Sequence, residues 1–266
     1  MTDRVTCTLS AGVADVRLNR PEKRNALDPA MFAALVETGT RLRDDRSVRA
    51  VVLSGEGPDF CAGLDTAVMG ALARGERRTA AVTLPPYDGP ARATGQRAAH
   101  VWAEIGVPVI AAVRGNALGG GLQIALGADI RIVAPDAALS VLEIRWGLVP
   151  DMTGTQLLPG LVGRDVAKEL TFTGRRVSGE EAVALGLATR TADDPHAAAV
   201  ELAAEIAGRN PDAVRWGKRL LELAGRVDLA TGFAAEQEAM AELIGSPNQA
   251  EAVAAAFERR PPRFTG

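Results

Sequence analysis

The chain has 266 residues, 47% of them hydrophobic, and a formal net charge of −3 at pH 7. This length and composition can bury a substantial core, either as one large domain or as a domain with an appendage. Acidic and basic residues are interspersed, and no apolar run reaches about 18 residues, which argues against nucleic-acid binding and against a membrane span. The sequence therefore indicates a globular protein in aqueous surroundings.

The cysteines and histidines of the chain indicate its cellular compartment and limit the catalytic groups that it can use. The N-terminal residues contain no hydrophobic signal region, and Cys7 and Cys61 stand far apart without a disulfide-framework pattern, so we expect a cytoplasmic protein. With only His100 and His196, no histidine-rich metal centre is expected, and the nucleophile pattern G-x-S-x-G does not occur. No metal site is predicted, and acid–base chemistry must rely on carboxylates.

The first third of the chain alternates between strand and helix patterns. Val5–Leu9 and Val13–Leu18 alternate apolar and polar residues around a short turn, which predicts a hairpin. Asp28, followed by proline, predicts a helix start, and the helical pattern reaches about Arg43. Val48–Ser54 then reads as a buried strand.

A glycine-containing turn follows that strand, over Gly55–Asp65, and such strand ends are the usual place for binding groups in an α/β protein. The alternative is an ordinary strand-to-helix turn in which Asp65 is the N-cap. The pattern weakens over Thr66–Gln96, which is a candidate for a mobile lid over an acyl pocket, or for a variable surface loop. Helical periodicity resumes over Arg97–Glu104.

A cluster of three glycines dominates the middle of the chain. The apolar run Val107–Val113 predicts a strand, and an apolar helical segment is expected directly after Gly121. Glycines let a ligand approach the backbone, and the first N–H groups of a helix have no partner inside it, so an oxyanion could bind there; a helix start packed on a sheet is the alternative. Leu122 and Ile124 stand where the phosphate-loop and dinucleotide motifs need other residues.

The second half of the chain moves from mixed structure to helix alone. A strand is expected at Ile130–Ala134, an extended piece at Ala138–Leu142, an irregular stretch at Glu143–Thr155, and helices at Gly163–Thr173 and after Ser178. From Ala197 onward the pattern is helical throughout, with the segments Ala197–Arg209, Pro211–Ala224, Leu229–Ile244 and Pro247–Arg259. We therefore divide the chain into an α/β core, residues 1–196, and a C-terminal helical region, residues 197–266, that is expected to mediate assembly.

Several blocks resemble those of a known family. Phe60–Asp65, Ala117–Gln123 and Glu143–Asp151 with Gly154–Gln156 are similar to the signature blocks of the crotonase superfamily, the enoyl-CoA hydratase/isomerases. The similarity continues through Phe172–Leu187 and a terminal Phe257–Phe264, so it covers nearly the whole chain.

The resemblance implies a crotonase-like spiral of ββα units, a homotrimer or a dimer of trimers, and a coenzyme A thioester as substrate rather than cofactor. It implies an oxyanion hole made by the N–H groups of Ala62 and Gly120. It also implies contacts of the substrate with Gly63, Leu64 and Asp65 beside the hole. Arg24 and Ala26 are expected near the nucleotide end of coenzyme A, and no metal or redox cofactor is implied.

The carboxylates distinguish the reactions of this family. Its two-glutamate hydratases place one glutamate at the position of Glu143 and the other where this chain has Gln123, which can orient a water or a substrate but cannot transfer a proton at neutral pH. Gln123 is alternatively a structural residue at a helix start. Hydration of a 2-enoyl-CoA and a double-bond shift, both with Glu143 as acid and base, therefore remain open.

Asp151 leaves two further alternatives. The dienoyl-CoA isomerases of the family also carry an aspartate at this position, so a dienoyl-CoA isomerase using Glu143 and Asp151 is one possibility, and a turn-capping Asp151 is the other reading. The aryl-CoA dehalogenases use the same aspartate as nucleophile, but they have tryptophan in place of Glu143. From a different class of function, a catalytically weak acyl-CoA-binding scaffold is the remaining alternative.

Overall fold

A computed structural model describes residues 3–76 and 84–266 of the chain. Within these residues, a six-stranded sheet has the strand order β1-β2-β3-β4-β6-β9. The hairpin β1–β2 is antiparallel and every later neighbour pairs in parallel. The strands are β1 (Val5–Ser10), β2 (Val13–Leu18), β3 (Ala50–Gly55), β4 (Val109–Val113), β6 (Ile130–Val133) and β9 (Arg190–Thr191).

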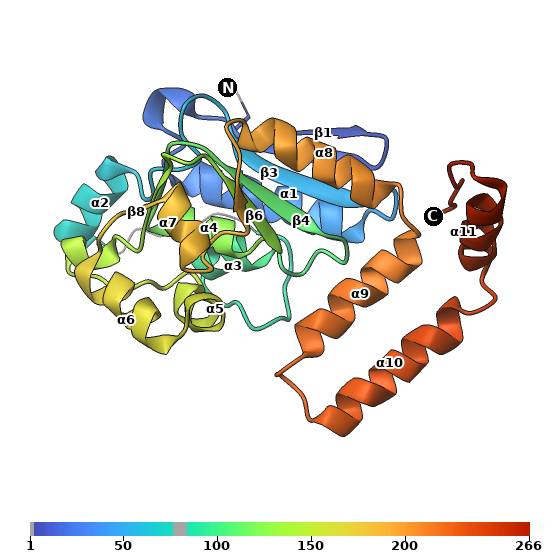
Figure 1. The fold of residues 1–266 in the computed structure, drawn as a ribbon. Coiled ribbons are helices and arrows are strands. Elements are labelled where there is room, and N and C mark those ends of the chain that lie inside the picture. Colours follow the sequence, from blue (N-terminus) through green and yellow to red (C-terminus); the bar gives the residue numbers. More distant parts are fainter. Residues whose placement is uncertain (1–2, 77–83) are drawn as a thin grey trace.

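A second sheet of three short strands, β5 (Asn116–Leu118), β7 (Ala138–Ser140) and β8 (Val177–Ser178), lies beside the first. The chain passes from β4 directly to β5 and from β6 directly to β7, so each of these turns contributes one strand to each sheet before the next helix. This repeated step is the expected ββα spiral. It brings the ends of strands that are distant in sequence to one region (Figure 1).

Helices cover both faces of the large sheet (Figure 1). Alternate residues of β3 belong to different apolar clusters: Val51 and Leu53 pack with α1, α3 and α4, whereas Val52 packs with Ala199 and Ala203 of α8. The helices of this part are α1 (Pro29–Asp44), α2 (Thr66–Ala73), α3 (Thr94–His100), α4 (Gly120–Leu126), α5 (Gly154–Val162), α6 (Arg164–Thr173), α7 (Gly179–Ala184) and α8 (Pro195–Ala207), with 3₁₀ turns at η1 (Pro21–Lys23) and η2 (Glu143–Trp146).

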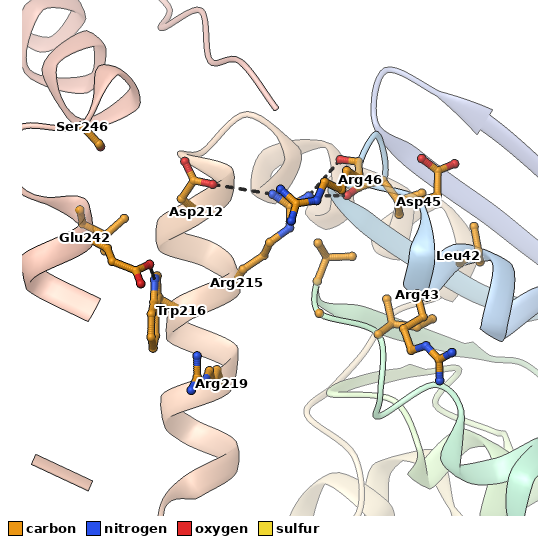
Figure 2. A pocket seen from close by; sticks show the side chains of 15 residues that line it. Leu42, Arg43, Asp45, Arg46, Asp212, Arg215, Trp216, Arg219, Glu242 and Ser246 are labelled. Atoms are coloured by element: carbon orange, nitrogen blue, oxygen red, sulfur yellow. Dashed lines mark hydrogen bonds and ion pairs between the residues drawn. The ribbon is translucent and has the colours of Figure 1, made fainter. Parts of the chain in front are cut away.

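The last three helices extend away from the sheets (Figure 1). They are α9 (Pro211–Leu223), α10 (Leu229–Leu243) and α11 (Pro247–Glu258). These three helices form a C-terminal arm, and a cavity of about 520 Å³ lies between this arm and the core. Figure 2 shows Arg215 reaching from α9 to the main-chain oxygen of Arg46, 3.0 Å away, while Trp216 Nε1 donates to Glu242 Oε2 of α10 at 2.9 Å.

Several predicted helix starts are confirmed by their capping hydrogen bonds. The Asp28 carboxylate accepts from Met31 N–H, the Ser178 hydroxyl from Glu181 N–H, and the Ser246 hydroxyl from Gln249 N–H. Each cap satisfies one of the N–H groups that a helix leaves without an internal partner. The short-range signals in the sequence are therefore sufficient at these positions.

Other boundaries differ from the prediction. Helix α5 occupies Gly154–Val162, although the sequence predicts an irregular stretch as far as Thr155; Pro159 in its interior and Gly163, at φ +79° after its end, obscure the periodicity. The helix of the glycine cluster begins at Gly120 rather than after Gly121. The helical pattern expected from Arg97 corresponds to α3, which runs from Thr94 and ends at His100.

Two expectations concern organisation. Residues 77–83 of the expected lid, 66–96, lie outside the described residues, and the first part of that segment forms α2. The division at residue 196 stays a prediction; helix α8, mostly on the C-terminal side of that boundary, packs on the sheet through Ala199 and Ala203.

Candidate active site

Two glycine turns from distant parts of the chain lie against each other. Cys61 and Ala117 form an isolated parallel bridge, which places the turn after β3 beside β5 and the glycine cluster. Gly63 has φ +90°, and a Cβ atom on it would lie 2.6 Å from the oxygen of Leu118 and 3.9 Å from the nitrogen of Gly120. Only glycine fits so close a backbone approach, and the two turns therefore form one site.

Each glycine of the cluster has its own steric reason. Gly119 has φ +52°, and a Cβ on it would lie 3.2 Å from Glu143 Oε1. A Cβ on Gly120 would lie 2.8 Å from Leu27 Cδ1, and one on Gly121 would collide with the main-chain oxygen of Cys61. The three glycines thus allow α4 to start against both the turn after β3 and the carboxylate of Glu143.

The predicted oxyanion donor Ala62 needs correction. Its N–H donates to the Arg24 oxygen at 2.9 Å, so this group already has an acceptor. The next segment pairs with Leu27: Leu27 N–H donates to Gly63 O at 2.8 Å, and Asp65 N–H donates to Leu27 O at 3.0 Å. In this parallel bridge the intervening Leu64 N–H points the other way, as alternate N–H groups of an extended segment do.

The N–H groups of Leu64 and Gly120 differ from that of Ala62. Within residues 3–76 and 84–266, neither has a hydrogen-bond acceptor. Both come from the two glycine turns that lie against each other. Of the two donors implied by the family resemblance, Gly120 has an N–H without an acceptor among the described residues, whereas the Ala62 N–H donates to Arg24 O.

Glu143, the first residue of η2, brings a half-buried carboxylate to the same cluster. Its Oε1 accepts a hydrogen bond of 2.7 Å from Gln123 Nε2. Its Oε2 is buried, with no hydrogen-bond partner in the described part of the chain. Burial is the largest cause that raises the pKa of Glu143 above its usual value, and the charge of Asp151 raises it further; hydrogen bonds from the main chain of Glu143 itself and from Gln123 oppose them.

Gln123 is buried, with 1% of its surface exposed, and it uses its amide oxygen as fully as its nitrogen. Its Oε1 accepts from Met152 N–H at 2.9 Å and from Gly154 N–H at 3.0 Å. The residue therefore connects α4, the Met152–Gly154 loop and η2. Sequence reasoning missed these two main-chain donors, because no residue-type signal marks a main-chain N–H.

Asp151 and Asp65 have different surroundings. Asp151 is exposed, and its charge acts on Glu143 without a direct hydrogen bond between them in the described structure. Asp65 is buried; its carboxylate caps α2 through Ala67 N–H at 2.8 Å and binds Arg20 Nη1 at 2.5 Å. Burial tends to raise the pKa of Asp65, but these two donors outweigh it and lower the pKa. The Asp65 side chain therefore stabilises the turn and the start of α2.

The segment expected near the nucleotide end of coenzyme A borders the site. Arg24 has a left-handed φ of +51° and an exposed side chain, whose Nε lies 3.7 Å from Asp59 Oδ2. The main-chain oxygen of Ala26 accepts from Arg20 Nη1 at 3.2 Å. The Arg24 guanidinium is thus exposed beside Asp59, and the main-chain oxygen of Arg24 accepts from the Ala62 N–H.

The described residues contain neither a metal-binding cluster nor a membrane-spanning helix. Among residues 3–76 and 84–266, no three His, Cys, Asp or Glu side chains gather as a metal site would require. Of the described helices, none combines the length and apolar character needed to cross a bilayer.

Known proteins are similar to this chain over nearly its whole length. The family model described as enoyl-CoA hydratase/isomerase matches residues 8–266. Human "Enoyl-CoA hydratase domain-containing protein 2, mitochondrial" is 37% identical over 262 residues, covering 96% of this chain and 86% of that protein. Mouse "Methylglutaconyl-CoA hydratase, mitochondrial" is 34% identical over 262 residues, with 96% and 80% covered.

A solved structure gives the same result for the fold. The crystal structure of enoyl-CoA hydratase from Bacillus anthracis superposes with a TM-score of 0.85 at 31% identity, covering 99% of both chains. The expected crotonase-type α/β fold is therefore confirmed. The chain is an enzyme of the lyase and isomerase group, and it belongs to the enoyl-CoA hydratase/isomerase family.

Proposed function

We propose that the protein binds an acyl-CoA thioester with the thioester oxygen between the N–H groups of Leu64 and Gly120. Two observations support this: both groups lack an acceptor among the described residues, and the turns that carry them lie against each other. Such preorganised donors stabilise the enolate that forms when a proton leaves the carbon next to the thioester. Each donor of this kind typically contributes roughly 3–4 kcal/mol in the transition state.

Glu143 is the proposed acid and base. Its Oε2 is unoccupied by any described side chain or main-chain group, and its raised pKa brings it closer to the pH at which a carboxylate can both take and return a proton. Gln123 cannot share this work, because an amide does not titrate and its oxygen already accepts two hydrogen bonds. One carboxylate suffices to remove a proton at one carbon and return it at another.

A double-bond shift in an enoyl-CoA is therefore the reaction that the geometry supports best. The single observation that carries it is the engagement of Gln123, which leaves Glu143 as the carboxylate of the site with a buried oxygen that no described group binds. In this reaction Glu143 Oε2 takes a proton from the γ carbon and delivers it to the α carbon, or the reverse, while the hole holds the dienolate oxygen. Every proton returns to the substrate, so the reaction has no co-reactant.

Hydration of a 2-enoyl-CoA is the second candidate. It is favoured by the names of the human and mouse relatives, both of which contain "hydratase". In this reaction Glu143 would take a proton from the water that attacks the β carbon and return it to the α carbon of the resulting enolate. A dienoyl-CoA isomerisation shared between Glu143 and Asp151 is a variant of the first candidate, supported by the effect of the Asp151 charge on the pKa of Glu143.

Product analysis distinguishes these reactions. The purified protein is incubated with 2-enoyl-, 3-enoyl- and 3,5-dienoyl-CoA in heavy-oxygen water, and the products are separated and weighed by mass spectrometry. Chromatographically shifted products of unchanged mass are expected for a double-bond shift. Gain of a labelled water from the 2-enoyl substrate would replace that reaction by hydration, and tight binding without turnover of any of the three would favour an acyl-CoA-binding scaffold.

The oligomeric state and the cellular compartment are part of the same proposal. The arm exposes large apolar side chains, among them Leu221, Phe233 and Phe257, which are 78%, 57% and 85% exposed in the single chain. Exposed apolar groups of this size favour an arrangement in which neighbouring copies cover them, which supports a homotrimer or a dimer of trimers. No cofactor besides the acyl-CoA substrate takes part. We retain the cytoplasm as the compartment, although the names of the human and mouse relatives place those proteins in mitochondria.

A further inference from the structure

The orientation of the Gln123 amide is fixed by its surroundings. One end of the amide faces two main-chain N–H groups, those of Met152 and Gly154, so this end must be the oxygen. The other end is therefore the nitrogen, and it donates to Glu143 Oε1 at 2.7 Å. A reversed amide would place its NH₂ group against two donors and its oxygen against a carboxylate.

The loop around that oxygen is held in an unusual conformation. Thr153, a β-branched residue, has φ +79°, a value that β-branched side chains rarely adopt because it strains the backbone. Its position between Met152 and Gly154 turns the N–H groups on its two sides toward the same oxygen. Such backbone strain persists where neighbouring interactions compensate for it, and here the two hydrogen bonds to Gln123 Oε1 do so.

We propose that Gln123 is a positioning residue that selects Oε2 of Glu143 as the proton-transferring oxygen and keeps Glu143 a single titrating group. This inference rests on the proposed function of Glu143. The amide nitrogen occupies Oε1, and Oε2 is the carboxylate oxygen that remains free and buried. Because the amide is itself anchored by two N–H groups, the carboxylate cannot rotate to exchange its oxygens without losing the Gln123 hydrogen bond.

The chemistry explains why an amide serves here rather than a second carboxylate. A glutamate at position 123 could still accept from Met152 N–H and Gly154 N–H with one oxygen. Its other oxygen would take the place of Nε2, 2.7 Å from Glu143 Oε1. Two carboxylates so close lose their protons in two steps, so below the second pKa they share one proton and they titrate as a pair. The amide N–H of Gln123 does not titrate, so it donates to Glu143 where a pair of carboxylates would need the shared proton.

Two substitutions test the proposal through the pH dependence of kcat/KM. Gln123→Met removes the donor while keeping the length of the side chain. Since the Gln123 hydrogen bond lowers the pKa of Glu143, the acidic limb of the profile should move to higher pH, and kcat should fall about tenfold or more with KM changed less than about threefold. Gln237→Met, at an exposed position of α10, is the matched control and should leave the profile unchanged.

Gln123→Glu tests the shared proton. Below the second pKa of the pair, the protonated carboxyl introduced at position 123 donates to Glu143 as the amide does, so activity should approach that of the wild type. Above it, both groups are ionised and repel, so a descending limb should appear that the wild type lacks. A Gln123→Met variant that is less stable but keeps the wild-type acidic limb, or a Gln123→Glu variant without the new limb, would overturn the proposal.

A direct titration separates this proposal from the proposed function. The side-chain carboxyl of Glu143 is followed by carbon NMR in the wild type and in both variants, with Glu143→Gln identifying its signal. The wild type should titrate in one step, the Gln123→Met variant in one step at higher pH, and the Gln123→Glu variant in two. These outcomes do not depend on turnover: an inactive wild type would contradict the proposed function alone, and unchanged titrations would contradict the role of Gln123 alone.

Discussion

Lys218 Nζ, on α9, lies 2.7 Å from Asp129 Oδ2, and this ion pair joins the C-terminal arm to the sheet. The same carboxylate oxygen accepts from Val109 N–H of β4 at 2.7 Å, and Lys218 also donates to the main-chain oxygen of Val107 at 3.1 Å. The Lys218 side chain is only 8% exposed, so water cannot easily replace it as a partner of Asp129. Lys218 is thus a nearly buried charged link between α9 and the sheet, beside the hydrogen bond from Arg215 to the main-chain oxygen of Arg46.

Replacing that group should destabilise the protein. Lys218→Met leaves Asp129 without its cation and should lower the free energy of unfolding by about 1.5–3 kcal/mol, the range for a hydrogen bond to a charged group. Urea denaturation measures this loss. Lys168→Met, at an exposed position of α6, is the control and should change stability by less than about 0.5 kcal/mol. Equal stability of the two variants would show that the ion pair contributes nothing to the attachment.

The turn that carries Leu64 should not tolerate a side chain at Gly63. In Gly63→Ala the new Cβ would meet the Leu118 oxygen, and relief of that contact must separate the Leu64 N–H from the Gly120 N–H. We expect kcat/KM to fall about a hundredfold or more, as for loss of one oxyanion donor. Gly225→Ala is the matched control: φ is +73° there, and no described atom lies within 4 Å of the new Cβ.

The two alanine variants separate backbone strain from collision. Both introduce a left-handed alanine, which costs about 1–2 kcal/mol, so both should lose that much stability in a denaturation experiment. Only Gly63→Ala should lose more stability than this, and only Gly63→Ala should lose turnover. A Gly63→Ala protein as active as the Gly225→Ala protein would remove this turn from the site.

Short-range signals in the sequence predicted much of the fold but not the contacts of the site. The caps at Asp28, Ser178 and Ser246 depend on residues a few positions apart, and all three were predictable. The family blocks identified the two glycine turns, yet they could not decide which N–H is free. The Ala62 N–H is not free because it donates to Arg24 O, and this contact joins segments separated by more than thirty residues.

The amide of Gln123 illustrates the same limit. From the sequence, Gln123 could orient a water, support the helix start or act on the substrate. Its partners Glu143, Met152 and Gly154 become its neighbours only through the turn after β7, and two of them act through main-chain atoms that every residue type possesses. Helix α5 was missed for a related reason, because Pro159 normally argues against a helix interior.

Cys61 should be unreactive in the folded protein. It is fully buried, its Sγ–H donates to Asn25 O at 3.1 Å, and burial raises the pKa of its thiol to about 12. At about pH 8 the thiol is therefore protonated and inaccessible, whereas Cys7 is partly exposed. Mass spectrometry after treatment with iodoacetamide should find label on Cys7 alone, and on both cysteines in denaturant. Rapid labelling of Cys61 without denaturant would contradict the packing of the turn.

Glu143→Gln should separate catalysis from stability. Turnover should fall at least about a hundredfold with binding of a non-reactive acyl-CoA nearly unchanged, as calorimetric titration would measure. Burial raises the pKa of Glu143 in the folded state, so the folded protein binds this proton more tightly than the unfolded chain does. Its contribution to stability is full below the ordinary pKa and declines as pH rises through the raised one.

The Tm of the variant relative to wild type should therefore increase between about pH 4 and about pH 8, since glutamine does not titrate. Glu236→Gln, at an exposed position of α10, is the control for the loss of a charge. A Tm difference that stays constant over this range would contradict the raised pKa of Glu143.

Asp151→Asn should change the pH profile more than the rate. The charge of Asp151 raises the pKa of Glu143, so its removal should move the acidic limb of kcat/KM to lower pH while turnover at the optimum stays within about threefold. Steady-state kinetics over a series of buffers measures both quantities. A hundredfold loss at the optimum would instead assign Asp151 a direct part in proton transfer, as in the dienoyl-CoA alternative.

The proposed oxyanion donors belong to the main chain, and this has a consequence for protein engineering. Exchange of the Leu64 side chain leaves its N–H in place, whereas exchanges at positions 123, 143 and 151 alter the groups that move or position protons. Binding of the thioester thus depends on main-chain atoms, whereas the choice of reaction depends on side-chain atoms. A library restricted to these three positions should sample new outcomes for the bound acyl group while every member retains the ability to hold it.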